Sequence, residues 1–328
     1  MDKLKFRAFA GPSDYPAMVA CANASFAADK SDIIRTVDEM ARDYSSFTSC
    51  DSQQDVWIAP AGDDIAGYVR GWHWAQADGL HLYGQLGVVA PNWRRQGIGK
   101  TLQIWLEARQ REIAAGHTEA VGHAHHVFVQ EGEAARAAML VKAGYHAERY
   151  FFAMVRPTLN NILDFALPLG LEIRPVQSDQ LRKIWDAHVL AFHTHWGFSA
   201  PDEADYQLWL KTKAQHPELW QVAWDTHSGE VAGQVRGFVD ESYNQSHGRK
   251  RGWTEFISVG ERWRKRGLAR ALISRSLHAQ AALDLQDSGL GVDGANLDGA
   301  NRIYEDCGFL VTKRNCIYRK PLELDSLS

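Results

Sequence analysis

The hydrophobic positions of this chain follow two alternating periods, and their order predicts a mixed α/β fold. Residues 56–59 and 220–224 are rich in β-branched and aromatic side chains, which indicates strands. In each case a polar turn and a second apolar run, beginning at Ile65 or Val231, predict a hairpin. Apolar positions recur at helical spacing over 98–113 and 268–283, and a further helix is expected over 180–192.

Three segments recur in the same order, which indicates a duplicated domain. Residues 89–99 match 259–269, residues 4–7 match 171–174, and residues 143–145 match 307–309, at offsets of 170, 167 and 164. Such slowly drifting offsets are typical of two tandem copies and not of a solenoid. We therefore predict domains at 1–156 and 171–328. A connector at 157–170 joins them, and Pro157, Pro168 and Gly170 mark it as a loop.

Composition and charge narrow the class of protein. The 36 basic and 40 acidic residues give a formal net charge of −4, which argues against a general nucleic-acid binder. No apolar run approaches the roughly 20 residues that span a bilayer, and the N-terminal residues lack the apolar stretch of a secretory signal. The four scattered cysteines form no close pair, which is typical of a reduced compartment. We expect a cytoplasmic protein with neither nucleic acid nor membrane as its partner.

A glycine-containing loop before a helix is the clearest chemical signal. Residues 264–269 lie between an apolar strand at 256–259 and a helix that begins near Gly267. A helix start offers unpaired N–H groups and a positive dipole end, which suit a diphosphate, and basic loop residues add to the attraction. A Walker loop is excluded by sequence, and a dinucleotide fold is disfavoured because this loop lies past mid-domain. A tight turn that only starts a helix would share the spacing, but the duplication favours anion binding.

The loop and a later segment together resemble the GNAT N-acyltransferase family. The residues that carry the resemblance are Val259, Trp263, Arg264, Gly267, Ala269, Tyr304, Gly308 and Phe309. The first copy repeats the loop pattern at 89–99, so the resemblance covers most of the chain. In that family the loop holds the CoA pyrophosphate, the preceding strand pairs with pantetheine, and the tyrosine lies near the CoA sulfur. The tandem arrangement, with its better-kept site in the C-terminal copy, is similar to mycothiol synthase but does not specify the acceptor.

The resemblance implies acetyl-CoA as co-substrate and names the residues that would hold it. In the second copy these are Ile257, Ser258, Val259, Arg264, Lys265, Arg266, Gly267, Leu268, Ala269 and Arg270. Family members place an asparagine seven residues before the tyrosine, whereas here Asn296 is eight before it and Asn301 three, so both stay candidates. The first-copy counterparts are Val88, Val89, Arg94, Arg95, Gln96, Gly97, Ile98, Gly99 and Lys100. Whether these hold a second CoA or only start a helix is left open by the sequence.

Two positions predict that only the C-terminal copy is catalytic. By the repeat offsets, Glu255 corresponds to Gln85, and Tyr304 corresponds to Leu140. An alkylamine with a pKa of about 10.4 is almost wholly protonated at pH 7, so acyl transfer to it needs a base. We predict Glu255 as that base, Tyr304 as the acid for the CoA thiolate, and the N–H of Ile257 as an oxyanion donor. The expected reaction is acetyl transfer to a primary amine of a small molecule within a ternary complex.

The acceptor side of the site is less defined by sequence. In GNAT proteins the segment after the first helix lines the acceptor pocket, which points to His193, His195, Trp196 and Tyr206, although a core stripe would look the same. His123, His125 and His126 invite a metal interpretation, and His123 and His125 would share one face of a strand. No third ligand follows these two at a typical spacing, so we expect no metal. A non-catalytic acyl-CoA sensor and a peptide or protein N-acetyltransferase are the alternative functions. Monomer and homodimer are both compatible with the sequence.

Overall fold

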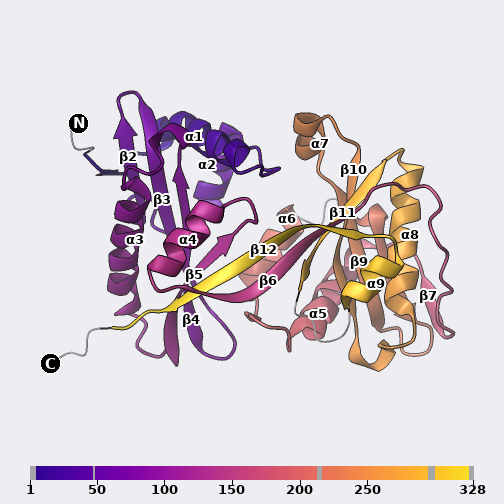
Figure 1. The fold of residues 1–328 in the computed structure, drawn as a ribbon. Helices are drawn as coiled ribbons and strands as arrows, with labels where there is room; N and C mark the ends of the chain where they lie inside the picture. Colours follow the sequence, from indigo (N-terminus) through magenta and orange to yellow (C-terminus); the bar gives the residue numbers. More distant parts are fainter. Residues whose placement is uncertain (1–4, 47–48, 213–215, 295–299, 325–328) are drawn as a thin grey trace. The chain divides into compact units, whose positions relative to one another are not determined.

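A computed structural model describes residues 5–46, 49–212, 216–294 and 300–324. The chain forms two compact units (Figure 1). Unit 1 comprises Met1–Arg149 and Asn315–Ser328, and unit 2 comprises Tyr150–Arg314. Among the described residues, no helix is both long and apolar enough to cross a membrane.

Unit 1 is a mixed sheet with helices on both faces. Its strands lie in the order β1 (Arg7–Ala8), β2 (Val56–Ala61), β3 (Asp64–Ala75), β4 (Leu80–Val89), β5 (Gly122–Val129) and the end of β12 (Leu310–Pro321). Only the β4–β5 pair is parallel among the pairs given for this unit. Helices α1 (Tyr15–Ala28) and α2 (Val37–Ser46) cover one face, and α3 (Ile98–Ala114) packs on the other. Helix α4 (Ala134–Lys142) precedes β6 (His146–Arg156).

Unit 2 repeats this plan, which confirms the predicted α/β class. Its strands lie in the order β7 (Leu171–Ile173), β8 (Trp220–Asp225), β9 (Val231–Val239), β10 (Arg251–Val259), β11 (Asp287–Asp293) and the end of β6. Helices α5 (Leu181–Phe192) and α6 (Glu203–Thr212) cover one face and α8 (Leu268–Ala282) the other, with α7 (Glu241–His247) and α9 (Ala300–Asp306) between strands. Both predicted hairpins, β2–β3 and β8–β9, are present.

Each copy contributes its last strand to the other unit. Residues 151–156 of β6 pair antiparallel with β11, and residues 316–321 of β12 pair antiparallel with β5. The compact units therefore differ from the predicted division at residues 156 and 171. The connector also belongs with unit 2, since Phe165 packs on its core and the Leu163 carbonyl accepts a 2.6 Å hydrogen bond from Ser274 Oγ on α8.

The exchanged strand β12 completes a buried polar cluster in unit 1. Lys320 Nζ lies 2.7 Å from the carboxylate of Glu107 on α3, whose side chain is 8% exposed. Tyr145 Oη and Gln103 Nε2 also donate to this carboxylate. Burial alone would raise the pKa of Glu107, but the hydrogen bonds from Lys320 and Gln103 outweigh it and hold this pKa below its usual value.

We expect Lys320→Met to lower the free energy of unfolding by about 1.5–3 kcal/mol at pH 7, because it removes the closer of the two cations of this buried carboxylate and leaves only Arg111, at 3.5 Å. The pair stabilises the fold fully above the unfolded pKa of 4.5, and this contribution is lost as pH falls through the lower folded pKa. The difference between variant and wild type should therefore shrink below pH 4.5. Urea unfolding of variant and wild type, at pH 7 and at a pH below 4.5, measures this difference in the free energy of unfolding. Lys142→Met, at an exposed α4 position, should cost less than about 0.5 kcal/mol, and equal losses in the two variants would contradict this role.

Candidate active site

The site of unit 2 forms where two neighbouring strands separate. Strand β10 pairs with β11 only from Arg251 to Trp253, opposite Asp287–Gly289. After Gly289, the described residues of β11 pair with β6 and no longer with β10. A cavity of about 890 Å³ lies along the freed part of β10 and extends to the start of α8 and to α9. The freed strand edge offers backbone groups to an extended amide-containing ligand.

A β-bulge shapes the freed part of β10. Glu255 faces Arg236 on β9, while Ser258 faces Gln234, so Phe256 and Ile257 together oppose a single residue. Phe256 has φ 51°, a left-handed conformation that is strained for a bulky side chain. The bulge breaks the alternation of the strand, and consecutive residues including Glu255, Phe256 and Ile257 line the cavity. In unit 1, β4 pairs with β3 without interruption from His81 to Val89 and has no such bulge.

The bulge corrects one equivalence that the repeat offset predicts. Gln110 donates to the carbonyl of Gly84 in unit 1, and Gln280, at the same place on α8, donates to the carbonyl of Trp253. The residue that follows Gly84 is Gln85, and the residue that follows Trp253 is Thr254. Both are buried, and each is hydrogen-bonded to the glutamine of its own unit. Gln85 therefore corresponds to Thr254, and the position of Glu255 is occupied in the first copy by Leu86. The prediction that the first copy lacks this carboxylate is unaffected.

The loop before α8 has the geometry of an anion cradle. Lys265 and Gly267 have φ 60° and 85°, and no side chain caps the helix. The first helical turn closes at Ala271, whose N–H bonds the carbonyl of Gly267, so the three N–H groups before it have no intrahelical acceptor. The loop and helix residues that line the cavity are Arg264, Lys265, Gly267, Leu268, Ala269 and Arg270. Arg266 points elsewhere and donates to the carbonyl of Leu169.

Tyr304 reaches the same cavity from α9. Its side chain is 8% exposed, and none of the described residues hydrogen-bonds its hydroxyl. Burial, with a smaller contribution from Cys307, raises the pKa of Tyr304 to about 12, so the hydroxyl keeps its proton at pH 7. Tyr304 and Leu140 occupy equivalent positions in the structure. The carbonyl of Tyr304 accepts from the N–H of Phe309, and the carbonyl of Leu140 accepts from the N–H of Tyr145, in each case five residues further on.

The predicted acceptor residues are only partly at the cavity. His195 lines it, with its ring stacked on Phe192 at 4.3 Å. Tyr206 is instead a core residue packed against Trp209, and His193 is exposed and bonds the Leu190 carbonyl. Trp196 is not among the lining residues and lies 6.4 Å from the ring of Phe151. Asn296 lies outside the described residues, and only the helical backbone of Asn301 is described.

Several cavity-lining residues were not predicted from the sequence, among them His188, Phe256, Asp293 and Arg302. His188 on α5 lies 3.3 Å from Ser258 Oγ, and burial lowers its pKa to about 3, so it is a neutral ring at the cavity wall. Its place on an amphipathic helix could have suggested a role, whereas Phe256 carries no local signal of its bulge.

The equivalent cavity of unit 1 is smaller, about 430 Å³, and has the acid Asp29 at the position that His195 occupies in unit 2. Arg94 is held by both carboxylate oxygens of Asp29 at 2.7 Å. Arg94 donates to the carbonyl of Ser25, and Arg264 donates to the carbonyl of Ala191, so these two carbonyls are equivalent. Asp29 comes four residues after Ser25 and His195 four residues after Ala191, so His195 occupies the position of Asp29 in unit 2. The predicted first-copy residues at this cavity are Val88, Val89, Arg94, Arg95, Gly97, Gly99 and Lys100, whereas Gln96 and Ile98 do not line it. In this copy the arginine equivalent to Arg264 is therefore already paired with a carboxylate.

Comparisons with known proteins agree with this geometry. The model of the Acetyltransferase (GNAT) family matches residues 26–145 and 181–309, and the chain belongs to this family. A mycothiol acetyltransferase of Propionibacterium freudenreichii subsp. shermanii is 27% identical over 265 residues, covering 80% of this chain and 76% of that protein. The protein is thus an acyl-CoA-dependent N-acyltransferase with two tandem GNAT domains.

Solved structures share the fold over the whole chain. A GCN5-related N-acetyltransferase from Sphaerobacter thermophilus has a TM-score of 0.78 at 23% identity, covering 98% of this chain and 97% of that one. A tandem GNAT protein from the clavulanic acid biosynthesis pathway has a TM-score of 0.65 at 14% identity, covering 99% of this chain and all of that one. At these identities the likeness concerns the fold alone.

We expect Gly267→Ala to weaken CoA binding about tenfold, because the left-handed φ of 85° strains any residue with a Cβ by about 1–2 kcal/mol and deforms the loop. Gly97→Ala is the matched control, since Gly97 has φ 88° at the same place in unit 1. Isothermal titration with CoA measures both variants. Equal weakening by the two substitutions would show that both units bind CoA, and weakening by Gly97→Ala alone would place the CoA site in unit 1.

Proposed function

We propose that unit 2 transfers an acetyl group from acetyl-CoA to a primary amine of a small molecule, and that unit 1 does no chemistry. The observation that carries the proposal is the single cavity that joins Glu255, Tyr304 and the uncapped start of α8. A cavity of about 890 Å³ is of the size that holds a small ligand beside a cofactor-like co-substrate.

Each group has one task in the proposed reaction. Glu255, on the freed strand, takes a proton from the acceptor ammonium directly or through one water. The neutral amine then attacks the thioester carbonyl, and the N–H of Ile257 stabilises the oxyanion. When the C–S bond breaks, Tyr304 donates its proton to the departing thiolate and takes back the proton that the amide nitrogen loses, while protonated Glu255 releases its own proton to solvent. The products are an amide and CoA.

Direct transfer without a covalent enzyme intermediate fits the residues present. Cys307 is the cysteine closest to Tyr304 in sequence, but it is buried, and burial raises the pKa of its thiol to about 11. A thiol with this pKa is not a thiolate at pH 7 and is a poor nucleophile. Acceptor and acetyl-CoA must then occupy the cavity together.

The acceptor class rests on the relative as well as on the cavity. The relative that is 27% identical over 265 residues is a mycothiol acetyltransferase. Small amines are therefore the first acceptors to assay. The side chains of His188, Phe192 and His195 form an aromatic wall on the side of α5, as in many small-molecule pockets.

We expect Glu255→Gln to lower kcat by about 10²–10⁴-fold at pH 7 while leaving the KM for acetyl-CoA nearly unchanged, because only proton removal is lost. The defect should shrink as pH rises towards the pKa of the amine, about 10, since more acceptor is then neutral. A thiol-release assay over pH 6–10 measures it.

Glu261→Gln, at an exposed position of the loop after β10, is the control and should keep wild-type kcat. An unchanged kcat in Glu255→Gln would remove this residue from the mechanism. CoA binding without turnover on any amine, in wild type as well, would instead favour a non-catalytic acyl-CoA sensor.

A further inference from the structure

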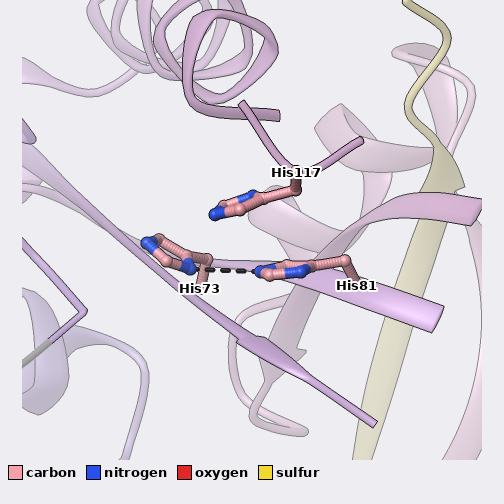
Figure 2. A group of neighbouring side chains, drawn as sticks. All are labelled: His73, His81 and His117. Atoms are coloured by element: carbon pink, nitrogen blue, oxygen red, sulfur yellow. Dashed lines mark hydrogen bonds between the residues drawn. The ribbon is translucent and has the colours of Figure 1, made fainter. Parts of the chain in front are cut away.

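Three histidines of unit 1 meet at the end of the β3–β4 hairpin. His73 is on β3, His81 is on β4 and His117 follows α3, and one nitrogen of each lies within 4.8 Å of the others. Figure 2 shows the ring of His117 lying over the His73–His81 pair. All three are part-buried, so solvent can still reach the cluster. No local sequence pattern marks them, because they come from three separate segments.

The closest pair already has the spacing of metal ligands. His73 Nδ1 lies 3.1 Å from His81 Nε2. Two nitrogens that bind one tetrahedral zinc ion at 2.0–2.1 Å are about 3.4 Å apart. An ion can therefore replace the proton that the two rings share with little movement of either. His81 and His117 are stacked at 3.9 Å between centroids, so one ring must rotate before all three lone pairs converge.

A second layer of hydrogen bonds orients the third ligand. Tyr83 Oη lies 2.8 Å from His117 Nδ1 and 3.1 Å from His123 Nδ1. A histidine that donates one ring N–H to an oxygen presents its other nitrogen as a lone pair, which is the usual support of a metal ligand. Burial, with the neighbouring histidines, lowers the pKa of His73 and brings that of His81 to about 4, so both rings are neutral at pH 7.

We propose that His73, His81 and His117 bind a divalent transition-metal ion, zinc by preference, with water as the fourth ligand. Three imidazoles and an open position suit zinc, and no carboxylate belongs to the cluster, which disfavours magnesium and calcium. The bound ion would tie the end of the β3–β4 hairpin to the turn after α3 and stabilise unit 1. Of the histidines weighed from sequence, His125 is fully buried and bonds Gln110, so it is not part of this site.

Zinc titration of the full chain after removal of metal tests the proposal. We expect one saturable site per chain, a rise in Tm of about 5 °C at saturating zinc, and visible d–d bands of a tetrahedral site with Co²⁺. His81→Gln and His117→Gln should each abolish the site, while CoA binding by unit 2 shows that the variants are folded. His146→Gln, at an exposed position of unit 1, should bind zinc as wild type does. Absence of a saturable site, or its survival in both cluster variants, would overturn the proposal.

A buried arginine next to the reactive strand carries a second, independent inference. Arg236 on β9 is 3% exposed, and its Nε and Nη1 atoms are buried without a hydrogen-bond partner among the described residues. Aromatic rings surround it, with the guanidinium carbon 4.4 Å from the Phe256 centroid and 5.3 Å from that of Trp209. Burial lowers the pKa of Arg236 to about 9, which still leaves it charged at pH 7.

This guanidinium lines a hollow of about 330 Å³ beside the main cavity. Phe256 lines both spaces, and Arg236 stands directly opposite Glu255 in the strand register. Asp240 and Glu241 are also at the hollow, but both are exposed, and the Asp240 carboxylate accepts from the N–H of Tyr243 at the start of α7. A buried cation with unused donors is unfavourable unless an anion meets it.

We infer that the acceptor amine carries an anionic group, a carboxylate first, which Arg236 binds while the amine faces Glu255. This inference rests on the proposed function. Planar guanidinium groups bind carboxylates and phosphates through paired hydrogen bonds, so the hollow gives the acceptor both affinity and orientation. The two aromatic rings keep water away from the pair and strengthen it.

Matched acceptors separate this inference from the proposed function. Thiol release is compared for an amino acid, its decarboxylated amine and its phosphonate analogue, with phenylalanine and phenethylamine as the first pair. We expect kcat/KM to be about 10- to 100-fold higher with an anionic group, and Arg236→Met to remove that preference mainly through KM.

Arg236→Lys should restore part of the preference, and Arg262→Met, at an exposed arginine of unit 2, should leave it intact. Equal rates on charged and uncharged amines, unchanged in Arg236→Met, would overturn the anionic subsite and leave amine acetylation standing. Turnover on none of the amines would refute the proposed function itself.

Discussion

The separation of β10 from β11 after Trp253 is the constraint on which the active site depends. Inside a sheet, backbone N–H and C=O groups are normally used by the neighbouring strand. Here the bulge at Phe256 bends β10, while β6 pairs with the other edge of β11. The freed groups of β10 are thereby available to a ligand, and the uncapped start of α8 lies at one end of the same opening. One local distortion thus creates the space, brings Glu255 to the cavity and leaves this edge of β10 without the β11 pairing.

The two copies show which parts of this arrangement are structural and which are chemical. Both have the left-handed glycine before the helix, at Gly97 and Gly267, so the fold alone retains it. Only unit 2 has the bulge, the carboxylate at 255 and the hydroxyl at 304. The exchange of β6 and β12 makes the copies depend on each other, because each sheet is completed by a strand from the other copy. The first copy therefore has a structural role whether or not it binds CoA.

Much of this could be predicted from the sequence, for identifiable reasons. The duplication, the anion-binding loop and Tyr304 are local patterns, and the structure gathers the loop and the tyrosine at one cavity. The one-residue bulge was invisible, because nothing in the sequence marks Phe256 as left-handed, and the fixed offset then matched Gln85 with Glu255. The strand exchange was also invisible, since a repeated strand has the same pattern whichever sheet it joins. Arg236 and the three histidines acquire their meaning only from distant partners.

The most direct test of the account is a crystal structure of the full chain with a non-reactive acetyl-CoA analogue. We expect one ligand per chain, with its diphosphate on the N–H groups at 266–270, its pantetheine along the freed edge of β10, and its thioester position between Glu255 and Tyr304. A diphosphate bound at the Gly97 loop alone, or a thioester position remote from both side chains, would contradict it.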